Sequence, residues 1–194
     1  MGEQYVPNSK IEKDFLKVYD DILTLQGIKY IHTRVVKIIV NNSKINSPNS
    51  FYTTFNTGYR TTLIMGIRRQ IKIRKDSLSL LGLLDNIRKN PSQITILNKT
   101  VDIGKISDDI SEIESKTEKY EYIADKFLAH TDPNRINDPI YIEHDEINET
   151  LDYLTNIIEK YLSDYFSFTA FMRINIKDLQ TWKDIFKVPW IEEE

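Results

Sequence analysis

Lys126 and His130 are the two residues of this chain whose side-chain types and spacing best suit a catalytic site. They lie one helical turn apart in the segment 122–133, YIADKFLAHTDP, which ends in a proline. Pro133 disfavours helical backbone at the residue before it, so we expect a helix to end near His130. The negative end of the helix dipole favours a protonated, accessible imidazole there. A lysine could hold a phosphodiester while the histidine moves a proton; the alternative is an ordinary exposed histidine.

The second candidate is a basic run at residues 68–75, RRQIKIRK, which begins with Arg68 and Arg69 and holds five basic residues in eight. One interpretation is structural. Cations near a helix C-terminus complement the helix dipole, and the acidic residues of segment 108–118 could lie alongside as a solvated ionic face. The other interpretation is a phosphate-binding stripe for RNA or a nucleotide. The sequence leaves both open.

The other two histidines do not suggest a site. His32 lies in an apolar segment and is expected to be a packed or surface residue. His144 belongs to the run Glu143-His144-Asp145-Glu146, whose side chains point in different directions and do not converge on one metal. The chain contains no H-E-x-x-H, G-x-S-x-G, P-loop or G-x-G-x-x-G motif. We therefore predict no metal and no cofactor.

Helices should position these residues, because apolar side chains recur at helical spacing along most of the chain. Ser9 is expected to cap the first helix, and Ser77 or Ser79 and Asp145 are expected to cap later ones. The segment 28–40 could be a helix or a buried strand, and its charges favour the helix. The expected helices cover residues 9–27, 51–75, 77–90, 102–130 and 145–166.

These helices predict an all-α bundle of five to six helices over residues 1–166. Gly58 and Gly66 should weaken their helix by about 1 kcal/mol each and could mark close helix contacts. Residues 167–194 are expected to form an irregular or partly extended C-terminal extension packed on the bundle. Within it, the alternation at 172–176 is typical of a short strand, and 178–186 could form a last short helix.

Composition excludes several classes of protein. The 194 residues carry 26 basic and 29 acidic side chains, a net charge of −3, which argues against a histone-like polycation. The absence of cysteine excludes a disulfide scaffold, a thiolate zinc site and a cysteine nucleophile. No secretory signal or membrane-spanning run is expected, so we predict a cytoplasmic protein. The excess of Ile, Lys and Asn over Ala is typical of AT-rich genomes and suggests a bacterial source.

Three short segments together resemble the HEPN superfamily, in its abortive-infection branch. The segment 125–132, DKFLAHTD, resembles the C-terminal helix motif of that superfamily. The segments 67–71, IRRQI, and 77–84, SLSLLGLL, are similar to its basic and Leu-rich helices. The similarity covers roughly residues 10–165.

The resemblance implies a HEPN-like α-helical domain that dimerises and serves phage defence or a toxin–antitoxin system. Many members are metal-independent ribonucleases with a composite site at the dimer interface. On this basis His130 and Asp125 would be the catalytic residues, and Lys126, Arg68 and Arg69 would bind RNA. The motif arginine is missing, because its place falls on Ala124.

A catalytically degenerate HEPN module is therefore the alternative. Such a module would bind a partner protein, RNA or a nucleotide instead of cleaving RNA. The resemblance also implies a homodimer, and a nucleotidyltransferase-type antitoxin as the partner in a toxin–antitoxin pair.

Overall fold

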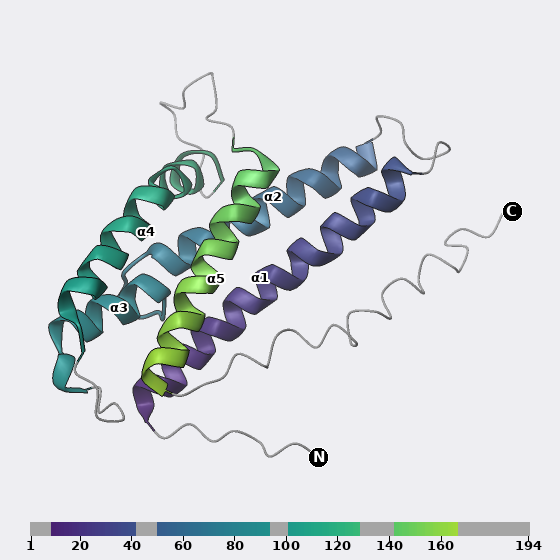
Figure 1. Cartoon of the computed structure of the whole chain (residues 1–194). Coiled ribbons are helices and arrows are strands. Elements are labelled where there is room, and N and C mark those ends of the chain that lie inside the picture. Colours follow the sequence, from purple (N-terminus) through teal and green to yellow (C-terminus); the bar gives the residue numbers. More distant parts are fainter. Residues whose placement is uncertain (1–8, 42–49, 94–100, 129–141, 167–194) are drawn as a thin grey trace, which may run out of the picture.

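The computed structural model describes residues 9–41, 50–93, 101–128 and 142–166. These residues form five α-helices and no strand, which confirms the all-α prediction (Figure 1). An isolated antiparallel bridge joins Arg74 and Ser77. The helices are α1 (Lys10–Val40), α2 (Ser50–Ile71), α3 (Leu80–Lys89), α4 (Ile103–Ile123) and α5 (His144–Phe166).

Helix α1 is a single helix of 31 residues. Ser9 is its N-cap, as predicted, and its hydroxyl oxygen accepts a hydrogen bond from the Glu12 N–H at 3.2 Å. The segment 28–40 is helical, and Gly27 does not end the helix. Buried Leu25 and Val35 lie on either side of Gly27, so one packed face continues through the glycine and outweighs its weak helix propensity.

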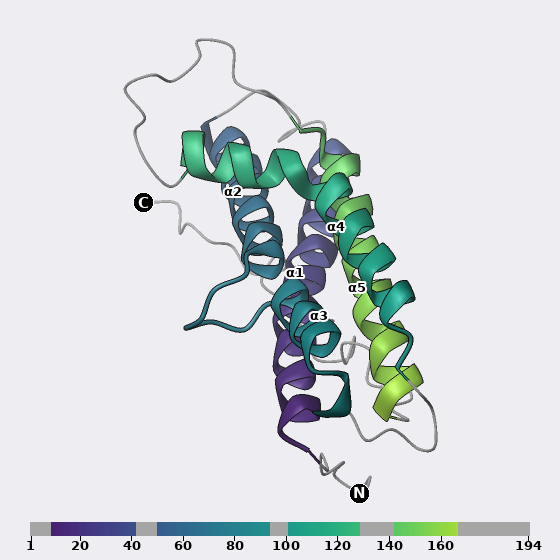
Figure 2. The same ribbon diagram turned by 90° about the vertical axis from the view of Figure 1, so that its left-hand side faces the viewer.

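Helix α2 ends at Ile71, four residues before the predicted end at Lys75. The physical reason lies in the residues that follow. Ile73 is 52% exposed, so a further helical turn would bury little apolar surface. Instead the chain leaves the helix and reaches Ser79, whose hydroxyl oxygen accepts the Gly82 N–H at 3.0 Å as the N-cap of α3. Figure 2 shows this connecting segment extending away from the bundle.

Helix α4 does not continue as one α-helix to His130. It ends at Ile123 and is followed by a π-helical turn, Ala124–Leu128. A π-turn inserts an extra residue into the helical repeat and is frequent at functional sites. Helix α5 starts at His144, so Asp145 lies inside the first turn and the prediction that it caps the helix is wrong.

The core runs between the helices, and one face of α5 is buried against it. Helix α5 lies along α1 (Figure 1). The buried α5 residues are Ile147, Thr150, Leu151, Leu154, Ile157, Ile158, Tyr161 and Leu162. Gly66 marks a close approach of α2 to α1, because a Cβ built on it would lie 2.5 Å from a methyl carbon of Leu25. Gly58 has open space around it and marks no contact.

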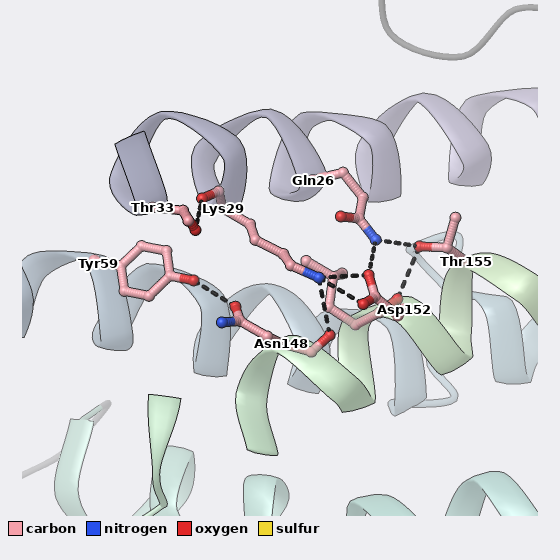
Figure 3. Close-up of polar contacts among 8 residues, drawn as sticks. Gln26, Lys29, Thr33, Tyr59, Asn148, Asp152 and Thr155 are labelled. Carbon is pink, nitrogen blue, oxygen red and sulfur yellow. Dashed lines mark hydrogen bonds and ion pairs between the residues drawn. The ribbon is translucent and has the colours of Figure 1, made fainter. Parts of the chain in front are cut away.

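Polar side chains join α5 to α1 and α2 near the start of α5 (Figure 3). Lys29 of α1 lies 2.6 Å from the Asp152 carboxylate of α5. Gln26 donates to Asp152 at 2.9 Å and to Thr155 at 2.8 Å. From α2, the Tyr59 hydroxyl donates to the side-chain oxygen of Asn148 at 2.6 Å. These bonds fix the orientation of α5 against the other two helices.

In the described part of the chain no helix has the length and apolarity needed to cross a membrane. Several predictions fall on residues outside the described ranges. They concern His130, the C-terminal extension 167–194 and its expected strand and short helix.

Candidate functional site

Asp125 lies in the π-turn that follows α4, and it accepts a hydrogen bond from the Arg68 guanidinium near the end of α2. The Asp125 side chain is 37% exposed, whereas that of Arg68 is 16% exposed. Lys72, one turn after Arg68, lies 3.5 Å from the second carboxylate oxygen of Asp125 and 2.5 Å from Glu121. The start of the basic run and the end of α4 therefore form one ion-pair network.

Arg69 belongs to a different network. Its guanidinium lies 2.9 Å from the Asp21 carboxylate of α1, and both side chains are about half-exposed. Adjacent helical residues point about 100° apart, so Arg68 faces α4 while Arg69 faces α1. The structure thus brings together Arg68 and Asp125, two of the predicted site residues, and it places Arg69 beside Asp21.

The remaining predicted site residues are Lys126 and His130. Lys126 follows Asp125 in the π-turn and its side chain is exposed. His130 lies outside the described residues. The described half of the candidate site therefore consists of Asp125, Lys126 and Arg68.

Ala124, the position at which the resemblance would place an arginine, is fully buried in the hydrophobic core. A long cationic side chain at this position would have to leave the core or carry its charge into it. The neighbouring Asp125 nevertheless has a guanidinium beside it, because Arg68 reaches it from α2. The guanidinium beside Asp125 thus comes from α2 and not from the neighbouring position 124.

A groove of about 620 Å³ lies between α1 and α2 and extends to the segment after α2. Four cations line it, Arg68, Arg69, Lys72 and Arg74, together with one carboxylate, Asp21. Lys72 and Arg74 were part of the predicted basic run but were not assigned to a site. The sequence indicates both residues, because the basic run continues beyond Arg69 to Lys72 and Arg74.

The acidic segment 108–118 does not provide the partners of the basic run. Asp109 instead accepts hydrogen bonds from Lys160 and Tyr161 of α5, each at 2.7 Å. Burial and the Asp109 carboxylate raise the pKa of the Tyr161 hydroxyl, so this phenol stays protonated and donates. The ionic pairing expected for the basic run exists, with Asp21, Glu121 and Asp125 as partners.

His32 and His144 form a stack of parallel rings with Tyr59. The ring centroids of His32 and Tyr59 are 3.5 Å apart, and those of His32 and His144 are 5.4 Å apart. The His32 imidazole is also hydrogen-bonded to Asn56 at 2.8 Å. Burial lowers the pKa of both histidines, and nearby Arg60 lowers that of His144 further. His32 is packed, as predicted.

Metal binding finds no support in the described ranges. No group of three or more His, Cys, Asp or Glu side chains in them could hold a metal ion.

Comparison with known proteins gives no family for this chain. A scan of protein-family models, a search of curated proteins and a search of solved structures each found no match. The functional assignment therefore rests on the residues and geometry described above.

Proposed function

We propose that this chain is a HEPN-like protein of a phage-defence or toxin–antitoxin system and acts as a metal-independent endoribonuclease. The observation that carries the proposal is the contact between Arg68 and Asp125. This contact supports the proposal because it pairs a guanidinium with the carboxylate of Asp125, which is five residues before His130 in the sequence. Phosphodiester cleavage needs groups of these kinds: a cation for the phosphate, a proton-transfer group and a carboxylate that orients one of them.

The proposed reaction is attack of the RNA 2′-hydroxyl on the adjacent phosphorus. A bond forms between the 2′-oxygen and phosphorus, and the bond from phosphorus to the 5′-oxygen breaks. His130 removes the 2′-proton as general base or protonates the leaving 5′-oxygen as general acid. Asp125 orients the reacting groups, and Lys126 with Arg68 stabilises the charge that develops on the phosphate. In a composite site at a homodimer interface, the two copies of His130 can take the two proton-transfer roles.

Cleavage of cellular RNA tests the proposal directly. The purified chain is incubated with total RNA in the presence of a chelator, beside the variants His130→Ala and Arg68→Gln. Removing a general acid or base costs about a hundredfold or more in rate, so His130→Ala should reduce cleavage to background. The products should end in 2′,3′-cyclic phosphates.

Lys17→Gln is the matched control for charge, because Lys17 is a 69% exposed cation on α1 that is not among the proposed site residues. This variant should cleave like the unmodified chain. Equal, background-level cleavage by the unmodified chain and His130→Ala would contradict the enzymatic proposal. Light scattering on the same samples tests the expected homodimer, and co-purification with the product of a neighbouring gene tests for a nucleotidyltransferase-type antitoxin.

The second candidate function is a catalytically degenerate HEPN module that binds a partner protein, RNA or a nucleotide. Two observations favour it. Position 124, where the resemblance would place an arginine, holds a buried alanine. Arg68 already has Asp125 as an ion-pair partner and is therefore not held for the phosphate alone. Binding of RNA that is left intact by the unmodified chain would support this candidate over the ribonuclease.

A further inference from the structure

The groove between α1 and α2 combines an apolar wall with a basic rim. Leu25 and Ile28 of α1 and Met65 of α2 supply the apolar part. The four cations outnumber the single carboxylate by three formal charges, in a chain whose net charge is −3. Its volume, about 620 Å³, lies within the range of roughly 300–1,000 Å³ that is common for ligand pockets.

Two of the arginines that line this groove have hydrogen-bond donors without a partner among the described residues. Arg74 forms no ion pair with any described residue, although Arg68, Arg69 and Lys72 each do. The Nε atom of Arg68 is buried without a hydrogen-bond partner in the described structure. A buried donor without a partner costs free energy, and a ligand that accepts from it after a shift of the Arg68 side chain recovers that cost. The groove therefore offers guanidinium donors to an incoming anion.

We infer that this groove binds a nucleoside phosphate, either free or as one unit of single-stranded RNA. Arg74 and Arg68 hold the phosphate, because guanidinium groups donate paired hydrogen bonds to phosphate oxygens. The base lies against Leu25, Ile28 and Met65, which cover its apolar face. The inference deepens the proposed function, with which it shares Arg68, and it adds Arg74 and the apolar wall as ligand-binding residues.

The lining also predicts how selective the site is. None of the described residues that line the groove is aromatic, so the base cannot stack on an aromatic ring. Discrimination between bases should therefore be weak, and the phosphate contacts should dominate. Affinity carried by phosphate contacts falls as salt rises, because counterions compete for the same cations.

Binding is measured with a fluorescent 2′-O-methyl oligonucleotide, which lacks the attacking hydroxyl and cannot be cleaved by the proposed mechanism. Arg74→Gln is the test variant, since removing this side chain breaks no internal ion pair. Lys75→Gln is the matched control, because Lys75 is the exposed neighbour of Arg74 and does not line the groove. Losing one charge-assisted contact should weaken binding by about tenfold in Arg74→Gln, with little change in Lys75→Gln.

Competition identifies the source of the ligand. Displacement of the oligonucleotide by adenosine monophosphate shows a site for free nucleotides, and failure of the monophosphate to compete shows a site for the strand. The inference is overturned by three results: no binding, equal losses in the two variants, or competition by inorganic phosphate as strong as by the nucleotide. If the chain cleaves RNA but Arg74→Gln binds the oligonucleotide as the unmodified chain does, the groove inference is refuted and the proposed ribonuclease is not. Binding without cleavage of natural RNA would refute only the nuclease.

Discussion

Replacing Gly66 by alanine tests the contact that sets the spacing of α1 and α2. A Cβ at this position would lie 2.5 and 2.7 Å from the two methyl carbons of Leu25, closer than real Cβ contacts allow. Leu25 is 6% exposed and must move to admit the new methyl group. Gly58 is the matched position, because it lies in the same helix and a Cβ there would meet nothing within 4 Å.

The expected free energies follow from two opposing effects. Alanine favours a helix interior over glycine by about 1 kcal/mol at either site. At Gly58 this effect acts alone, so Gly58→Ala should stabilise the fold by up to about 1 kcal/mol. Overpacking at Gly66 costs about 1–3 kcal/mol. Because Leu25 also lines the groove, it has room on one side, and we expect a cost near the lower end, about 1–2 kcal/mol.

The difference between the two variants isolates the overpacking, since the helix-propensity gain is common to both. It should equal about 1–2 kcal/mol in urea unfolding, or roughly 3–6 °C in melting temperature for a chain of this size. Adding Leu25→Ala removes the clashing methyl groups, so Gly66→Ala should no longer destabilise in that background. Equal shifts for Gly58→Ala and Gly66→Ala would refute the reasoning, because they would mean that α1 and α2 do not approach closely at Gly66.

Three further predictions concern the pKa shifts, a helix cap and a buried carboxylate. The pKa values of His32 and His144 are lowered in the folded chain, so the unfolded chain binds more protons just below pH 6.5. The free energy of unfolding should therefore fall as the pH drops from 7 toward about 5.5. In urea titrations, the free energy of unfolding of His144→Phe should depend less on pH over this range. Ser79→Ala removes the N-cap of α3 and should cost about 1 kcal/mol, whereas an unchanged midpoint would show that the cap is dispensable. Tyr161→Phe removes a 2.7 Å hydrogen bond to the buried Asp109 carboxylate and should cost about 1.5–3 kcal/mol, and a calorimetric loss well below that range would contradict the contact.

Local signals in the sequence were sufficient for much of the fold. Ser9 caps α1 as predicted, and Ser79, one of the two predicted candidates, caps α3, because an N-cap depends only on a side chain and the three residues after it. The buried face of α5 follows from apolar spacing alone. The end of α2 and the π-turn after α4 were not predicted, because they depend on how much apolar surface the neighbouring helices can cover at these positions.

The candidate site was predicted only in part, because ion-pair partners depend on how helices far apart in sequence are turned toward one another. In one of the two interpretations the basic run could lie beside segment 108–118, whereas in the structure Arg68 faces Asp125 and Arg69 faces Asp21. Asp109 instead forms an ion pair with Lys160 of α5. No spacing rule within one segment could have distinguished these pairings.

Acidic partners are confirmed for three residues of the basic run, and the phosphate-binding interpretation of the run stays a prediction. Arg68, Arg69 and Lys72 have acidic partners, and Arg74 has none among the described residues. A phosphate that engages the unpartnered Nε of Arg68 would lie next to Asp125, which already accepts from the same guanidinium, and the two anions would repel each other unless Asp125 gains another donor. Lys72, 3.5 Å from Asp125, is placed to become that donor. Ligand binding at Arg68 and the position of Asp125 should therefore be coupled through Lys72. Replacing Lys72 should for this reason affect the proposed site as replacing Arg68 or Asp125 does.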